Sequence, residues 1–443
     1  MTPRALDMAA RDDPWATRRS KRCALCGRAF GCRQGEPGCW CESIELDRET
    51  LAQIRSLADD CICPSCLGTF ARQGQGADAP PDGKAPPRRA SQWAKAIPHA
   101  AVRSRGVSLV WGACAAAFLV GALLLGLVIG PVGIGAGSIA GSALSHLPLL
   151  GMHSRLAAID EAILWQVRAP RVVLAALVGG MLAIAGSAYQ GVFRNPLADP
   201  YLLGVAAGAG LGATLAIAYV SAGTGELLPL AAFGGAIVGV AGTYALGRSA
   251  GGTGGTAALI LAGVAVAAFM TAAQTFVQQQ HAETLRQVYS WLLGGFGGAD
   301  WQEVALLAPY VAVSSAVILA HRRVLDVLSL GDEEAGALGL NVRRARLAIV
   351  VAATAGTAAA VAVSGLIGFV GIIVPHTIRL LVSSSYRAIV PLSLLVGAGF
   401  LVLADLIARA ALAPAELPIG VITAFFGAPF FAVVLRATRR VEC

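Results

Sequence analysis

Residues 167–204 read VRAPRVVLAALVGGMLAIAGSAYQGVFRNPLADPYLLG, an apolar run bounded at both ends by arginine and proline. Its central part, residues 172–192, has no charged side chain. That length suffices to cross a hydrocarbon core of about 30 Å, which takes about 20 helical residues. Pro196 and Pro200 then prevent the helix from continuing and fix a turn. The stretch therefore predicts a membrane-spanning helix followed by a stiff polar loop.

Nine other segments repeat this apolar pattern between residue 107 and the C-terminal region. We therefore predict an all-α polytopic membrane protein with ten transmembrane helices and a small cysteine-rich N-terminal module. The predicted spans are residues 107–130, 172–192, 201–220, 229–247, 257–278, 302–320, 347–363, 367–384, 389–407 and 417–436.

The composition indicates a lipid environment. Hydrophobic residues make up 56% of the chain and charged residues 14%, and the mean hydropathy is +0.67. These values exclude an ordinary soluble globular protein. The net charge of +8 does not indicate nucleic acid, because surplus arginine in a membrane protein reflects positively charged cytoplasmic loops. We expect membrane lipid around the chain, no nucleic-acid partner, and both termini in the cytoplasm.

Small residues are frequent within the predicted spans, as in AAGAGLGA from Ala206 and FGGAIVGVAG from Phe233. Such residues let helix backbones approach closely where the hydrophobic driving force is absent. They predict a compact helical bundle. Charged or ionisable side chains at lipid depth are few: His376, Arg379 and Asp405. Burial makes these functional candidates, and we expect the His376 ring to bond a carbonyl freed by Pro375 rather than iron.

Composition divides the chain into four parts. Residues 1–22 are charged and are expected to be disordered, and residues 23–70 form the cysteine-rich module. Residues 71–104 are rich in Gly, Pro and charge, so we expect a flexible linker. Residues 105–440 form the membrane domain.

The module holds eight cysteines, and their density indicates crosslinks or metal. Because the cytoplasm is reducing, thiolate coordination is favoured over disulfides, and the Cys-x-x-Cys spacing suits zinc. A metal or redox sensor, an iron–sulfur site and an incidental fusion remain alternatives. The segment resembles the small cysteine-rich CWC proteins through Cys39-Trp40-Cys41. The predicted metal ligands are Cys23, Cys26, Cys32, Cys39, Cys41, Cys61, Cys63 and Cys66.

Four polar segments of the membrane domain together resemble one family. VRAPR from Val167, FRNPLADPYLLG from Phe193, LGDEEAGALGLNVRR from Leu330 and GFVGIIVPHTIRLL from Gly368 are similar, in order and spacing, to motifs of FecCD-type permeases. These are membrane subunits of ABC importers for ferric siderophores, haem and cobalamin. The resemblance implies a bacterial inner-membrane permease that pairs as a homodimer with an ATPase dimer and a periplasmic substrate-binding protein.

The resemblance also implies roles for particular residues. Arg168, Arg171 and Arg409 would dock acidic residues of the binding protein, although arginines anchoring to lipid phosphate are the alternative. Asn195 and Leu197 would form the cytoplasmic gate with Gly255 and Thr256. A cytoplasmic loop would couple to the ATPase, a solvated loop being the alternative. Its predicted coupling residues are Asp332, Glu333, Leu338, Leu340, Asn341, Arg343 and Arg344.

No catalytic side chain is predicted, so we expect a transport subunit and not an enzyme. The chain has no G-x-x-x-x-G-K-[ST] phosphate loop, so ATP would be hydrolysed on a partner. A polytopic redox or metal-sensing protein using the cysteine module is the alternative function. It would require intramembrane histidine or acidic pairs at ligand spacing, which the sequence does not contain, or a separate output domain.

Overall fold

The computed structural model describes residues 20–22, 29–31, 67, 107–130, 132–145, 156–220, 224–249 and 255–441. The chain forms two compact units, Met1–Pro98 and His99–Cys443. In the first, β1 (Ser20–Arg22) pairs antiparallel with β2 (Ala29–Gly31), placing Lys21 opposite Phe30. β1 falls within residues 1–22, so backbone pairing orders the last three residues of the segment expected to be disordered.

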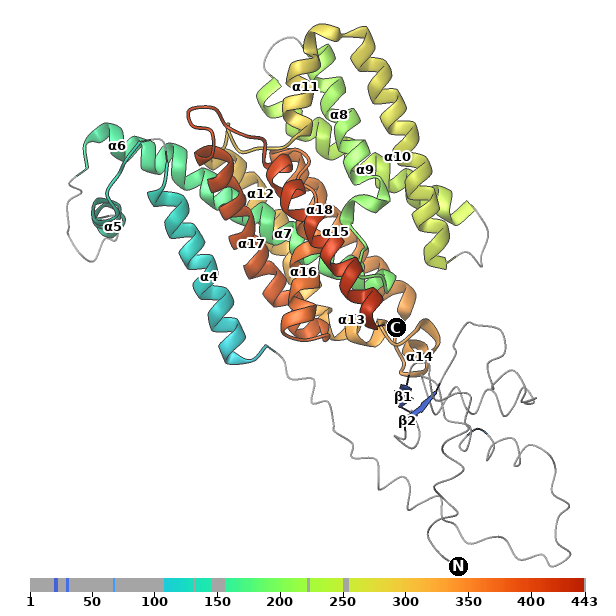
Figure 1. Cartoon of the computed structure of the whole chain (residues 1–443). Coiled ribbons are helices and arrows are strands. Elements are labelled where there is room, and N and C mark those ends of the chain that lie inside the picture. The colour runs from blue at the N-terminus through green and yellow to red at the C-terminus, as the bar shows by residue number, and fades with distance from the viewer. Residues whose placement is uncertain are drawn as a thin grey trace, which may run out of the picture. The chain divides into compact units, whose positions relative to one another are not determined.

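The second unit is helical in its described residues (Figure 1). Its longer helices are α4 (Leu109–Val128), α7 (Ala169–Phe193), α8 (Val205–Tyr219), α9 (Thr224–Ser249), α10 (Gly255–Gln280), α12 (Trp301–Ala320), α15 (Val342–Ser364), α16 (Val370–Leu381), α17 (Tyr386–Ala410) and α18 (Ile419–Val441). Its shorter elements are α5 (Ala136–Ser145), α6 (Ala158–Ala162), the π-helix η3 (Ile163–Arg168), the 3-10 helices η4 (Pro200–Leu203) and η5 (Ala282–Thr284), α11 (Leu285–Leu292), α13 (Arg322–Leu328) and α14 (Asp332–Ala337).

Within the described residues, seven helices are long and apolar enough to cross a membrane. Three shorter apolar helices, Val205–Tyr219, Val370–Leu381 and Ile419–Phe430, coincide with further predicted spans. Each of the ten predicted spans therefore falls on one apolar helix. Length alone supports seven crossings, and the full number of ten stays a prediction.

The second span is longer than predicted. α6, η3 and α7 run without interruption through Ala158–Phe193, a segment of 36 residues. Pro170 lies in the first turn of α7, directly after η3, and the Ala169 N–H bonds back to the Leu164 carbonyl. The wider π-helical turn accommodates a proline ring that would otherwise clash with the preceding turn. The helical segment therefore begins 14 residues before the predicted start of this span at residue 172.

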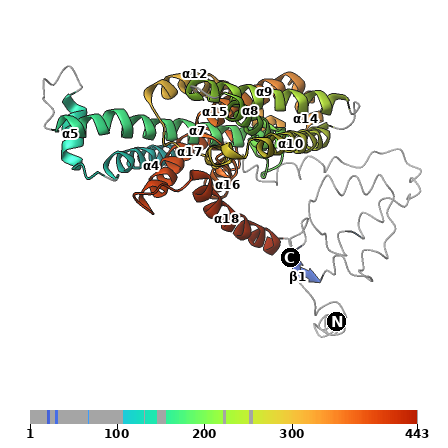
Figure 2. The same ribbon diagram turned by 90° about the horizontal axis from the view of Figure 1, so that it is seen from above.

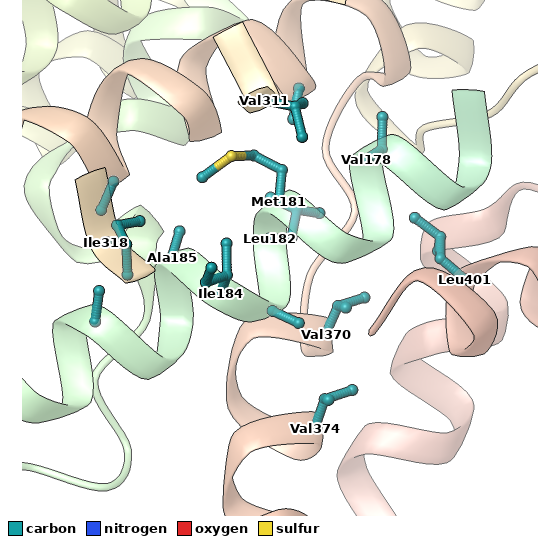
Figure 3. Packing of buried hydrophobic residues seen from close by; sticks show 14 of the residues in the cluster. Val178, Met181, Leu182, Ile184, Ala185, Val311, Ile318, Val370, Val374 and Leu401 are labelled. Carbon is teal, nitrogen blue, oxygen red and sulfur yellow. The ribbon is translucent and has the colours of Figure 1, made fainter. Parts of the chain in front are cut away.

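α7 is the central helix of the bundle, and it packs against α12, α15, α16 and α17. Figure 3 shows Met181 and Leu182 of α7 among Val311 of α12, Val370 of α16 and Leu401 of α17. A second apolar cluster joins α8 and α9 to α15. Seen from above, α18 extends away from the bundle toward the C-terminus (Figure 2).

Glycine contacts hold the helices close together. A Cβ atom on Gly186 of α7 would overlap the carbonyl of Gly371 on α16, and one on Gly208 of α8 would overlap the carbonyl of Gly235 on α9. The prediction that small residues permit close backbone packing is therefore confirmed for these helices.

Candidate functional site

Two groups of charged residues lie at opposite ends of α7. Arg171 lies near its N-terminus and Arg194 follows its C-terminus. A helix of 25 residues rises about 37 Å, so the groups are far apart. We call Arg171, Asp405, Arg409 and Glu416 the ion cluster. We call Arg194, Asp332 and Arg346 the charge triad.

In the ion cluster, the Arg171 guanidinium donates to two carboxylates. Its Nε and Nη2 lie 3.0 and 2.9 Å from Asp405 Oδ1. Its Nη1 and Nη2 lie 2.9 and 3.0 Å from the two carboxylate oxygens of Glu416. Arg409, one helical turn after Asp405, places Nε 3.3 Å from Asp405 Oδ2. The cluster therefore joins the start of α7, the end of α17 and the α17–α18 loop.

Two arginines also satisfy the C-terminal carbonyls of α4. The last carbonyls of a helix have no partner within it, and α4 has no basic residue in its last turn. Arg168 Nη1 lies 3.0 Å from the Leu127 carbonyl and 3.3 Å from that of Val128, and its Nη2 donates to the Val132 carbonyl. Arg409 Nη2 lies 2.7 Å from the Gly126 carbonyl. These bonds attach the end of α4 to α7 and α17.

The three arginines predicted to dock a binding protein are therefore buried. Arg168, Arg171 and Arg409 are 3%, 8% and 4% exposed, and each has partners within the chain. The cluster member that reaches solvent is Glu416, with 45% of its side chain exposed. The docking role stays a prediction, and any acidic partner must reach guanidinium groups that already hold intramolecular bonds.

Sequence reasoning marked Asp405 as costly to bury but did not pair it with Arg171. The i, i+4 spacing of Asp405 and Arg409 was a usable signal for their contact. Glu416 was missed as a site residue. No local signal could find it, because its partner lies 245 residues away in the sequence.

The predicted gate loop begins at the other end of α7. Arg194 ends the helix with a left-handed backbone at φ 51°, and the Asn195 N–H bonds back to the Gln190 carbonyl at 3.2 Å. The Asn195 side-chain oxygen accepts from the Leu197 N–H at 2.9 Å, and Leu197 is 45% exposed. Gly255 and Thr256 begin α10, and their side chains lie outside the described part of the chain. The predicted turn is confirmed, and its stiffness and the gating role stay predictions.

Asp199 lies between the gate loop and η4 and is half-buried. Its Oδ1 accepts from the Tyr201 N–H at 2.7 Å, which caps η4. Burial raises the pKa of the Asp199 carboxyl to about 6, and this hydrogen bond opposes the shift. The Tyr201 hydroxyl donates to the Ile367 carbonyl at 3.0 Å and so ties η4 to the segment before α16.

The predicted coupling loop forms α14 and the start of α15. Ala335 of α14 is fully buried, whereas Leu330 and Leu338 are 63% and 67% exposed. Asn341 caps α15 through the Arg344 N–H at 3.1 Å. Asp332 belongs to the charge triad, and Leu340 is half-buried. The remaining predicted coupling residues, Glu333, Arg343 and Arg344, are exposed.

The other ionisable residues predicted at lipid depth have separate surroundings. Arg379 Nη2 donates to the Tyr386 hydroxyl at 2.8 Å, and its guanidinium lies 5.0 Å from the centre of that ring. His376 Nδ1 is buried without a hydrogen-bond partner among the described residues. The expected bond to a carbonyl is therefore not found at that nitrogen. The ring instead packs edge-on against Phe430, with centroids 5.9 Å apart.

All eight predicted metal ligands, Cys23 to Cys66, lie outside the described residues. The same holds for the predicted linker, residues 71–104. Coordination by the module stays a prediction.

Comparisons with known proteins place both regions in families. The sequence profile of the FecCD transport family matches residues 118–437, and that of the cysteine-rich CWC family matches residues 23–68. The cobalamin import system permease protein BtuC of Halobacterium salinarum is 38% identical over 74% of this chain and 96% of its own length. The vitamin B12 import system permease protein BtuC of Citrobacter koseri is 42% identical over 63% of this chain and 84% of its own.

A solved structure agrees with these matches. It shows an ABC transporter assigned to the metal-chelate type, in an inward-facing conformation, with 31% identity and a TM-score of 0.63. The match covers 73% of this chain and 98% of the solved one. The profile match spans most of the membrane domain and the apolar helices described above. The chain therefore belongs to the FecCD transport family.

Proposed function

We propose that this chain is the permease subunit of an ABC importer that moves an iron chelate (siderophore or haem) or cobalamin from the periplasm to the cytoplasm. ATP hydrolysis on a separate subunit drives the transport. Support comes from the family, whose relatives include permeases named for cobalamin import. A homodimer of permeases, an ATPase dimer and a substrate-binding protein complete the transporter in the bacterial inner membrane.

The exposed surface of α14 is the observation that carries the proposal. Leu330 and Leu338 flank a charged helix of six residues that is too short to cross a membrane. Exposed leucines on an otherwise charged loop favour a protein partner over water. An ATPase groove suits such a helix, and under this proposal the α14 end faces the cytoplasm and the ion-cluster end faces the periplasm.

Changing Leu338 tests the ATPase contact. We expect the wild-type chain to co-purify with its partner ATPase. Leu338→Asp should weaken that association by about tenfold or more, because a buried leucine contributes about 1.5–3 kcal/mol. Leu338→Met keeps the apolar volume and should retain the complex. Equal binding by all three proteins would show that α14 does not face the ATPase.

Uptake into proteoliposomes identifies the cargo. The permease and ATPase would be reconstituted, and the binding protein supplied with cobalamin, a ferric siderophore or haem in separate assays. One cargo should accumulate only with ATP. Accumulation of none of them, by a complex that still hydrolyses ATP, would contradict the proposed cargo classes.

The ion cluster is proposed as the docking region of the binding protein. The cluster contains two arginines and two carboxylates, and the nearby Arg168 adds positive charge. Glu416 competes with any acidic residue of the partner for Arg171. Glu416→Gln should therefore tighten binding several-fold at low salt, and the gain should shrink at high salt. Glu283→Gln removes an exposed charge outside the cluster and should have a smaller effect.

Zinc is proposed for the cysteine-rich module. Eight thiolates suffice for two tetrahedral sites, so purified full-length protein should carry about one to two zinc ions per chain. Changing Cys23 and Cys26 together to serine should lower that content. Iron in place of zinc, or no metal in the purified protein, would overturn this part of the proposal.

A further inference from the structure

Asp332 holds two arginines from different helices. Its Oδ1 and Oδ2 lie 2.8 and 3.0 Å from Arg346 Nη2 on α15. Its Oδ1 lies 3.4 Å from Arg194 Nη2 at the end of α7. Asp332 is also the first residue of α14. One carboxylate therefore joins the predicted coupling helix to both the gate loop and α15.

Arg194 is firmly attached to the gate loop. Its left-handed backbone is an uncommon conformation for a residue other than glycine and costs roughly 1–2 kcal/mol. Hydrogen bonds from Arg194 and Asn195 N–H groups to the Gly191 and Gln190 carbonyls hold this geometry. A displacement of the Arg194 side chain is therefore transmitted to the turn that begins at Asn195.

The two contacts of Asp332 in the charge triad differ in length and in exposure to solvent. Arg346 Nη2 donates to both Asp332 carboxylate oxygens at 3.0 Å or less, and the Arg346 side chain is 23% exposed. The contact between Arg194 and Asp332 is longer, and both side chains are more than two-fifths exposed. An exposed ion pair contributes about 0.2–1 kcal/mol. The contact to Arg194 can therefore break and form again during a transport cycle, while the contact to Arg346 persists.

We propose that Asp332 is the positioning residue that transmits movement of α14 to the gate loop through Arg194. This inference rests on the proposed function, because it assumes that a partner ATPase moves α14. Asp332 stays with α14 and α15 through Arg346. The Arg194 contact forms in one conformation and fixes the gate loop there. Loss of the contact leaves the ATPase bound but its hydrolysis poorly linked to opening of the gate.

The test measures ATP hydrolysed per cargo molecule transported, using permease and ATPase reconstituted in proteoliposomes. Arg194→Gln and Asp332→Asn each remove one side of the contact. Each should raise that ratio by about fivefold or more, the range typical of coupling between two sites. Arg323→Gln is the matched control. Arg323 is exposed on neighbouring α13 and makes no ion pair with any described residue, so the ratio should stay at its wild-type value.

A triple charge reversal shows whether the ratio depends on the ion pairs of the triad or only on the charge of each residue. Arg194→Asp, Asp332→Arg and Arg346→Asp together restore opposite charges at every contact, and the ratio should return toward the wild-type value. An unchanged ratio in Arg194→Gln would overturn the inference, and so would a triple variant as poorly coupled as the single ones. Loss of ATPase binding in Asp332→Asn would assign Asp332 to docking instead. Absence of an ATPase complex in the wild-type protein would overturn the proposed function itself.

Discussion

The two ends of α7 carry the same types of charged groups in opposite surroundings. In the ion cluster, the side chains of Arg171 and Asp405 are 10% and 1% exposed. In the charge triad, those of Arg194 and Asp332 are 43% and 44% exposed. Removing one member of a buried pair leaves an uncompensated charge, whereas exposed pairs are hydrated and screened. Burial, rather than the number of ion pairs, therefore separates the structural role of the ion cluster from the proposed role of the charge triad in transmitting movement.

The largest expected loss of unfolding free energy comes from neutralising Asp405. Asp405→Asn leaves Arg171 with Glu416 alone and Arg409 without its carboxylate partner. The unfolding free energy should fall by about 3–5 kcal/mol, the cost of an uncompensated buried charge. Thermal unfolding of the purified protein in detergent measures the change, with the exposed Glu283→Gln as control. A loss below about 1 kcal/mol would indicate that water reaches the cluster and would remove the contrast with the triad.

Much of the fold was predictable from hydropathy. Each predicted span coincides with an apolar helix, because about 20 uncharged residues have few alternatives to a helix in lipid. Helices outside the spans, such as α5 and α11, were not predicted. They are short, and α11 mixes Arg286 and Gln287 with apolar residues, so a hydropathy pattern of membrane length does not include them.

The sequence identified most of the residues of the candidate sites, but it did not predict which residues contact one another. The motifs identified Arg168, Arg171 and Arg409, and family resemblance suggested an exposed docking role. The buried Arg171 is paired with Asp405 and Glu416, which are more than 230 residues away in the sequence. Contacts at that separation follow from tertiary packing and leave no periodic signal in the sequence. The triad shows the same limit, because α14 reaches Arg194 only in the folded bundle.

Asp199 lies in the loop after α7, at the same end of that helix as the charge triad. It tests whether burial of a charged group also lowers the stability of the folded state there. Its folded pKa of about 6 lies above the usual 3.8 because burial disfavours the charged form. The folded state therefore binds this proton more tightly than the unfolded state. The resulting stabilisation is complete below about pH 3.8 and is lost as pH rises through 6. The loss is at most about 3 kcal/mol.

Asp199→Asn should remove this dependence. Asparagine keeps an oxygen for the Tyr201 N–H and carries no charge. The variant should unfold at a higher temperature than wild type at pH 7.5 and at nearly the same temperature at pH 4. Parallel curves for the two proteins between pH 4 and 7 would show that the carboxyl is hydrated in the folded state.

Arg168 lies close to the ion cluster but bonds to backbone carbonyls instead of carboxylates. Changing it tests how much these hydrogen bonds stabilise the end of α4. Arg168→Met keeps the apolar stem but leaves the Leu127, Val128 and Val132 carbonyls without this donor. The expected destabilisation is about 1–3 kcal/mol, the cost of unsatisfied buried polar groups. Hydrogen exchange should accelerate at the end of α4, including the Ile129 amide, and stay unchanged near Trp111. Uniform acceleration along α4 would contradict a local capping role.

The smallest expected changes in unfolding free energy are those of variants at Glu416 and Asp332. Their side chains are 45% and 44% exposed, although they lie at opposite ends of α7. Glu416→Gln leaves Arg171 paired with Asp405, and Asp332→Asn keeps a side-chain oxygen that can accept from Arg346 while the exposed Arg194 is hydrated. Each change should lower the unfolding free energy by less than about 1 kcal/mol. Thermal unfolding of the two variants side by side checks this equality. A loss of several kcal/mol in Asp332→Asn alone would make the triad a structural element, whereas equal small losses leave its contact weak enough to open and close in each transport cycle.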